Sequence, residues 1–111
     1  MKNMFYPIKL DKMRNLRYGM KALSLVEETL GMPAAKLNMD NMTMKDAATI
    51  IWAGLVHEDK DLTPDKVMDL IDDNSTIEEA VNSMSKALEG AFGGNEDKNP
   101  KKAVGKGKNL A

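Results

Sequence analysis

The amino-acid sequence predicts an α+β fold that is mainly α. A short N-terminal β-hairpin packs on a compact bundle of about four helices, and a disordered C-terminal tail follows. Three observations predict this: apolar and polar residues alternate near the N-terminus, four later segments carry apolar residues at helical spacing, and the chain becomes Gly- and Lys-rich from residue 93. The 111 residues suffice for one small domain, predicted at residues 1–92, with a flexible tail at 93–111.

The composition excludes several classes of protein. The chain has 16 Lys and Arg residues against 17 Asp and Glu, a net charge of -1, so it lacks the positive excess of a generic nucleic-acid coat. It contains no cysteine, which excludes disulfides, thiolate metal sites and cysteine nucleophiles. The longest nearly apolar run, residues 47–56, is far shorter than the roughly 20 residues of a membrane span. Because the N-terminus also lacks the apolar core of a signal peptide, we expect a soluble cytoplasmic protein.

The N-terminal hairpin is predicted from alternation on both sides of a polar turn. Apolar residues stand at every second position in residues 8–10 and 16–18, and the polar pair Asp11-Lys12 lies between them. Because a two-stranded hairpin is marginally stable alone, it should lie on helices. An irregular arm that runs into the first helix is the alternative.

The first helix is predicted at residues 20–30, where Met20, Leu23, Val26 and Leu30 share a face. Gly31 is a favourable residue just after a helix, and Pro33 prevents continuation. Residues 34–42 are weakly patterned, so we expect a loop there.

The second helix should begin after Thr43, which forms a partial capping box with Asp46. The residues that follow are apolar on more than one face, so this helix is expected at the centre of the core. Gly54 weakens a helix by roughly 1 kcal/mol relative to Ala, and we expect that it serves close packing.

Two further helices complete the bundle. The third begins at Thr63-Pro64, with Thr as N-cap and Pro at the first helical position. The fourth is expected after Ser75, paired with Glu78 as a capping box, and ends at Gly93-Gly94. The expected buried stripes are Val67, Leu70 and Ile71 in the third helix and Ile77, Val81, Met84, Leu88 and Phe92 in the fourth.

The tail and the body differ in charge. Residues 93–111 hold five Lys against Glu96 and Asp97, a net charge of +3, whereas residues 1–92 hold 11 basic and 15 acidic residues, a net charge of -4. The tail has almost no apolar content, so it cannot offset the entropy of ordering and is expected to be disordered.

The residues that enzymes and metal sites need are largely missing. His57 is the single histidine, and Asp61 stands where a zinc-protease motif requires a second one. Residues 59–70 begin like a calcium loop, but Pro64 and Leu70 occupy its glycine and glutamate positions. No phosphate-binding or nucleophile-elbow motif is present. We therefore expect no enzyme activity, no metal and no cofactor.

A binding protein remains, and its 10 methionines indicate how it binds. Methionine is flexible and polarisable, so it suits surfaces that accommodate varied apolar partners. Met20 and Met84 lie on expected buried stripes and are interpreted as core, whereas the methionines in or beside the 34–42 loop suit an exposed patch. The single Trp is more often a core residue, but it would dominate an interface if exposed. The candidate partner-binding residues are Met39, Met42, Met44, Trp52 and Met68.

Two stretches of the sequence resemble tail assembly chaperones of long-tailed bacteriophages and of related prophages and gene-transfer particles. Residues 14–31, RNLRYGMKALSLVEETLG, resemble the hairpin strand and first helix of that family. Residues 47–73, AATIIWAGLVHEDKDLTPDKVMDLIDD, resemble its apolar helix, the polar turn after it and a short helix. Together the resemblance spans about residues 5–90.

The resemblance implies a chaperone that binds the tape measure protein and keeps it soluble during tail-tube assembly, with the tail tube protein as a second partner. It implies the cytoplasm of the infected or lysogenic bacterial host, and absence from the mature virion. Members are often made in two lengths by programmed ribosomal frameshifting, and Lys106-Gly107-Lys108-Asn109 is compatible with an A-rich slippery run in the gene. The family pattern assigns no role to an individual residue here.

Two alternatives stay open. One is a small helical nucleic-acid-binding or regulatory module that uses the third and fourth helices as a helix-turn-helix-like pair, although the acidic residues there disfavour phosphate contact. The other is a minor structural protein of the virion, such as a head-tail connector. A homo-oligomer is compatible with the sequence.

Overall fold

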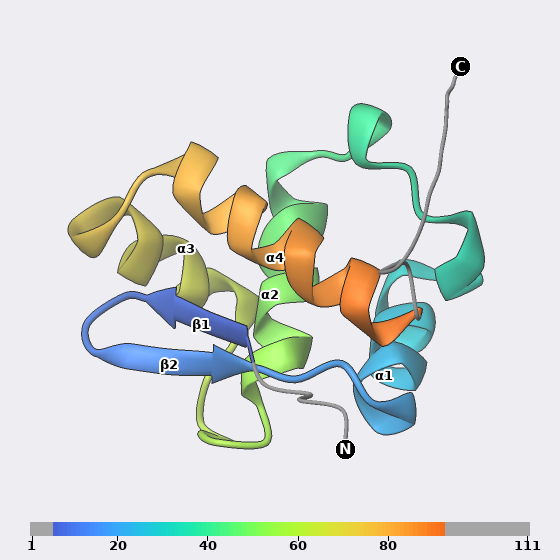
Figure 1. The fold of residues 1–111 in the computed structure, drawn as a ribbon, viewed down its shortest axis with the longest axis horizontal. Coiled ribbons are helices and arrows are strands. Elements are labelled where there is room, and N and C mark those ends of the chain that lie inside the picture. The colour runs from blue at the N-terminus through green and yellow to red at the C-terminus, as the bar shows by residue number, and fades with distance from the viewer. Residues whose placement is uncertain (1–5, 93–111) are drawn as a thin grey trace.

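The structure is a computed structural model and describes residues 6–92 (Figure 1). The expected flexible tail, residues 93–111, lies outside the described residues. The elements follow the order β1 (Tyr6–Lys9), β2 (Met13–Leu16), α1 (Met20–Leu30), η1 (Ala34–Lys36), η2 (Met39–Asn41), α2 (Met44–Leu55), α3 (Pro64–Asn74) and α4 (Ile77–Ala91), where η marks a 3₁₀ helix. The predicted fold class is confirmed: an N-terminal hairpin packs on four α-helices.

The hairpin is antiparallel and pairs Tyr6 with Leu16 and Ile8 with Arg14, so the alternative of an irregular arm is wrong. Ile8 and Leu16 are buried, because alternate residues of a strand point to the same face. Strand β1 lies against α4, and β2 lies against α2 (Figure 1). The helices therefore cover the apolar face that a lone hairpin would leave in water.

Helix α2 is the central element, as the sequence predicts. Its capping box is complete: the Thr43 side chain accepts from the Asp46 N–H, and the Asp46 carboxylate accepts from the Thr43 N–H. The helix contacts α1, α3, α4 and β2. The largest side chains that are fully withdrawn from solvent come from all the elements around it: Leu16, Ile50, Ile51, Leu55, Met84, Val26 and Val67.

Gly54 permits a close approach between α2 and the segment that follows β2. A Cβ atom at Gly54 would lie 2.7 Å from Cζ of Tyr18, so no larger residue fits without movement. The Tyr18 hydroxyl donates to the Ile50 carbonyl at 2.6 Å, and the Arg17 N–H donates to the Gly54 carbonyl at 2.9 Å. Burial raises the pKa of the Tyr18 hydroxyl, so it stays a donor. The prediction that Gly54 serves close packing is confirmed.

Arg14 is a buried cation that ties the hairpin to the loop before α3. Its Nε and Nη2 atoms donate to the two carboxylate oxygens of Asp11 at 2.8 and 3.0 Å, and its Nη1 lies 3.6 Å from Asp59 Oδ2. The Arg14 guanidinium lowers the pKa of the Asp11 carboxyl, chiefly through the side-chain hydrogen bond. The buried guanidinium of Arg14 is thus paired with carboxylates, which offsets the free-energy cost of removing its charge from water.

The bounds of α1 and the starts of α2 and α3 agree with the sequence prediction. Gly31 adopts the left-handed conformation with φ of 72° and ends α1, and Thr63 caps α3 with Pro64 at its first position. The expected 34–42 loop instead contains the two 3₁₀ turns, η1 and η2. An Asn38 side chain that accepts from the Asp40 N–H stabilises η2, which is the local bonding that Asn favours in turns.

The predicted cap of α4 is off by one residue. Thr76, and not Ser75, is the N-cap, and its side chain accepts from the Glu79 N–H at 3.1 Å. The Ser75 hydroxyl donates instead to the Glu79 carboxylate at 3.3 Å. Both residues stand three before a glutamate, so the sequence pattern alone fits either cap.

Several apolar residues predicted in the core are exposed. Met20 is 89% exposed, and Ile77 and Phe92 are each more than half exposed, whereas Met84 is fully buried as predicted. All three exposed residues lie at a helix end. Helical spacing predicts a shared face, but burial of the first or last turn of a helix depends on which elements pack against it.

Candidate partner-binding groove

Three helices enclose an open apolar groove of about 200 Å³, which we call the Met groove. Helices α2, α3 and α4 each contribute one face to it. The lining residues are Met44, Ala47, Ala48, Ile51, Met68, Ile71, Asp72, Ile77, Ala80 and Val81.

The α2 side of the groove follows one helical stripe. Met44, Ala47, Ala48 and Ile51 are spaced three and four apart, so their side chains point the same way. Ala47 and Ala48 are buried, and their single methyl groups leave the space that a larger side chain would fill. Met44 follows the Thr43 cap at the open end and is 55% exposed. This side thus has small residues at its base and an exposed methionine at its open end.

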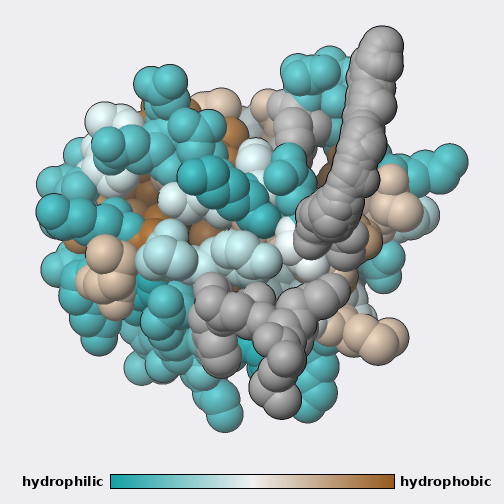
Figure 2. Space-filling model, viewed as in Figure 1, coloured by the Kyte–Doolittle hydropathy of each residue, from teal (hydrophilic) through white to brown (hydrophobic). Residues whose placement is uncertain are grey.

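The other two sides repeat the same spacing. Met68, Ile71 and Asp72 come from α3, and Ile77, Ala80 and Val81 come from α4. Ile77 follows the Thr76 cap as the first residue of α4 and is 54% exposed. Figure 2 shows brown, apolar atoms between teal ones in the upper left half of the molecule, near the first turns of α2 and α4 in Figure 1.

The helices that line the groove are strongly acidic. Asp72 lies in the lining itself, and all the other acidic residues of residues 64–91 are exposed. Against two lysines, Lys66 and Lys86, this segment carries seven acids: Asp65, Asp69, Asp72, Asp73, Glu78, Glu79 and Glu89. The Met groove is therefore an apolar slot on a negatively charged surface.

The size and lining of the groove favour a peptide side chain as its occupant. Sites for small molecules typically measure about 300–1,000 Å³, and this groove is smaller. An apolar anchor of an amphipathic helix is a single side chain, which needs less room. Asp72 is the one ionisable residue in the lining, and no nucleophile or base lies beside it there.

Within residues 6–92, no cluster of three His, Cys, Asp or Glu side chains could hold a metal ion. His57 lies apart from the groove, and its Nε2 is 2.8 Å from the Asn15 carbonyl oxygen on β2. Asp59, the first residue of the calcium-like stretch, accepts from the Asp61 N–H in a local turn and contacts Arg14. These residues join the hairpin to the α2–α3 connection.

The structure brings together two of the five candidate residues predicted from the sequence. Met44 and Met68 line the Met groove from α2 and α3. Met42 is half-buried against the core and is not part of the lining. Met39 lies in η2.

Trp52, the fifth candidate, serves the fold. It is half-buried against the core, and its indole Nε1–H donates to the Leu62 carbonyl at 2.8 Å. This bond fixes the connection between α2 and α3, so that Thr63 can begin α3. Trp52 is not among the residues that line the Met groove.

Most residues of the groove are not predicted from the sequence. Ile77 was assigned to the core, although its position at the start of a helix was a signal that its side chain could be exposed. The alanines of α2 and α4 carried no signal of a site, because alanine is equally common where helices simply pack closely. Only the packing of α2, α3 and α4 against one another makes these alanines part of a groove.

No protein-family model, curated protein sequence or solved structure matches this chain. Among the described residues, no helix has both the length and the apolar content needed to cross a membrane.

Proposed function

We propose that this protein is a tail assembly chaperone of a long-tailed bacteriophage, or of a related prophage or gene-transfer particle, and that it binds the tape measure protein through the Met groove. The observation that carries the proposal is the exposed apolar slot between α2, α3 and α4, with Met44 and Ile77 each more than half in solvent. Residues 47–73, which resemble that family, supply two of its three sides.

The chemistry of the groove fits a helical apolar client. A client helix would insert one or two apolar side chains between the stripes, in the helix-in-groove mode of peptide recognition. Burial stabilises the complex by roughly 25 cal/mol per Å² of apolar surface, or about 1.5–3 kcal/mol for each large anchor. Methionines at the lip adapt to successive client segments of different shape.

The acidic surface adds selectivity to this apolar contact. Basic residues that flank the apolar stripe of a client would be attracted by the exposed carboxylates of α3 and α4. Clients with acidic flanks would be repelled. The proposed role is binding without catalysis, in the host cytoplasm, with the tail tube protein as a second partner and with the protein absent from the mature virion.

Co-expression with the tape measure protein encoded in the same genome tests the proposal. The soluble fraction of that client should rise when the full chain is present, and the two should co-purify. The double variant Met44→Gln/Ile77→Gln should abolish most of this gain, because it places two amides at the lip of the groove. Gln has a helix propensity equal to or better than those of Met and Ile, so both helices should persist.

Met13→Gln is the matched control, since Met13 is 61% exposed on the hairpin, outside the groove lining. It should leave client solubility unchanged. A client that stays insoluble with the wild-type chain, or equal loss in the groove and control variants, would contradict the proposal. Detection of the chain in purified particles by mass spectrometry would favour the alternative of a minor structural protein of the virion.

A further inference from the structure

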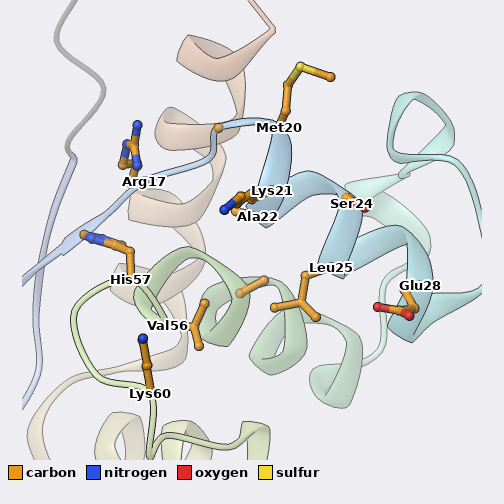
Figure 3. Close-up of a pocket in the computed structure, with 12 residues that line it drawn as sticks. Arg17, Met20, Lys21, Ala22, Ser24, Leu25, Glu28, Val56, His57 and Lys60 are labelled. Carbon is orange, nitrogen blue, oxygen red and sulfur yellow. The ribbon is translucent and has the colours of Figure 1, made fainter.

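A second hollow, which we call the basic hollow, lies between α1 and the C-terminal end of α2 (Figure 3). It has a volume of about 830 Å³ and shares no residue with the Met groove. Its lining residues are Arg17, Gly19, Met20, Lys21, Ala22, Ser24, Leu25, Glu28, Ala53, Val56, His57 and Lys60.

The charge of this hollow is opposite to that of the molecule around it. Residues 6–92 contain 10 basic and 15 acidic residues, a net charge of -5. The lining contains three cations, Arg17, Lys21 and Lys60, together with one carboxylate. Figure 3 shows these cations and His57 on one side of the hollow, with the Glu28 carboxylate at the other end.

Three separate parts of the chain hold these cations. Arg17 follows β2, Lys21 lies in the first turn of α1, and Lys60 lies in the connection from α2 to α3. No ion pair joins Lys21 or Lys60 to a carboxylate within residues 6–92. Like charges gathered at one site repel one another, and an anionic partner would relieve that repulsion.

The floor of the hollow is apolar. Leu25 of α1 and Val56 after α2 are both half-buried, Ala53 is buried, and Met20 is 89% exposed. An apolar floor beside a cluster of cations matches a segment that presents an apolar side chain next to carboxylates. A nucleic acid backbone offers no such apolar group, and the lining contains no Phe, Tyr or Trp on which bases could stack.

We propose that the basic hollow is a second docking site, which binds an acidic amphipathic helical segment of a partner protein. Carboxylates of the partner face Arg17, Lys21 and Lys60, and an apolar side chain of the partner rests on Leu25 and Val56. The two surfaces of this chain thus select partners of opposite charge, because the Met groove lies among acids and the hollow among cations. The binding of this segment does not depend on the identity of the client in the Met groove.

A designed peptide tests this second site on the full chain. The probe is a peptide of about 14 residues with Leu at positions i, i+3, i+4 and i+7 and Glu on its remaining face. Affinity is measured by fluorescence anisotropy, and the contact surface by amide shifts of the ¹⁵N-labelled protein. The double variant Lys21→Glu/Lys60→Glu should weaken binding by about tenfold or more, and added salt should weaken the wild-type complex.

Lys12→Glu/Lys86→Glu is the control, since it makes the same change in net charge at two exposed lysines outside the hollow. It should change the affinity by about twofold or less, because charges farther away than a Debye length are screened. Equal weakening in both double variants, or the absence of saturable binding to the wild type, overturns the proposal. It is also overturned if the peptide shifts map to the Met groove, or if a short DNA duplex competes with the peptide for the hollow.

Discussion

The two ends of helix α2 face different surroundings. Near its C-terminal end, the ring of Tyr18 closes against Gly54 and its hydroxyl bonds to Ile50, so that this side of the helix is covered. At its N-terminal end, Met44 extends into solvent and Ala47 lines an open slot. The C-terminal end of α2 thus contributes packing that stabilises the fold, whereas its N-terminal end lines the exposed groove.

The difference lies in what covers the helix, since both of its ends carry apolar residues. The hairpin brings the bulky Leu16 and Tyr18 over the C-terminal half of α2. Over the first turns, the α3 and α4 helices meet α2 through alanines and half-exposed side chains. Changes at the closed end should therefore cost folding free energy, whereas changes at the open end should cost binding.

The largest expected effect is on the free energy of unfolding when a buried methionine is truncated, compared with an exposed one. Met84→Ala should lower the free energy of unfolding by about 2–5 kcal/mol, because Met84 is fully buried and the change leaves a cavity. Met44→Ala should change it by about 0.5 kcal/mol or less, because that side chain is mostly in solvent. Urea denaturation of both variants measures the two values, and equal losses would contradict the contrast between core and groove.

A change at the closed end of α2 should have the next largest effect. Gly54→Ala should destabilise the protein by about 1–3 kcal/mol, since the new Cβ would lie 2.7 Å from the Tyr18 ring. This cost opposes the gain of about 1 kcal/mol that Ala brings to a helix. In a Tyr18→Leu background the same change should cost less, because the ring is gone. Thermal and urea unfolding of the two pairs test this, and a stabilising Gly54→Ala would refute close packing here.

The smallest expected effect is the pH dependence of the ion pair in the hairpin. Arg14 lowers the pKa of Asp11 below its ordinary value of 3.8, so ionised Asp11 stabilises the folded state. This contribution is complete above the unfolded-state pKa and is lost as the pH falls through the lower folded-state pKa. Asp11→Asn should therefore destabilise the protein at pH 7, and the variant and wild type should converge in stability as the pH falls through the folded-state pKa of Asp11.

Arg14→Met supplies the control for this titration. In that background Asp11→Asn should have almost no effect on the urea midpoint at pH 7 or at acidic pH, since the pair is already broken. A difference between the Asp11 variant and the wild type that stays constant with pH would contradict the assigned role of the pair.

Local features of the fold could be predicted from the sequence because they depend on residues a few positions apart. The Thr43 capping box, the Thr63 cap and the left-handed Gly31 are all bonds or dihedrals within one turn of chain. The neighbouring Ser75 and Thr76 show the limit, since both fit the same capping pattern and only the packing of α4 selects between them.

Burial at helix ends could not be predicted in the same way. The sequence predicts Met20 and Val26 on one buried stripe of α1, yet Val26 is buried and Met20 is 89% exposed. Helical spacing gives the face of a residue, whereas burial depends on whether another element reaches that turn. The same limit applies to the candidate site. Met44 and Met68 could be predicted because methionine suits an apolar binding surface, but tertiary packing alone brings them together with Ile77.

Methionine methyl spectroscopy tests most directly whether the Met groove binds an apolar client. The full chain, labelled with ¹³C at the methionine methyl groups, is titrated with a peptide from an amphipathic segment of the tape measure protein. We expect the signals of Met44 and Met68 to shift saturably, while those of Met13, on the hairpin, and Met84, in the core, stay in place. Saturable binding that leaves Met44 and Met68 unmoved would contradict the assignment of the groove as the client site.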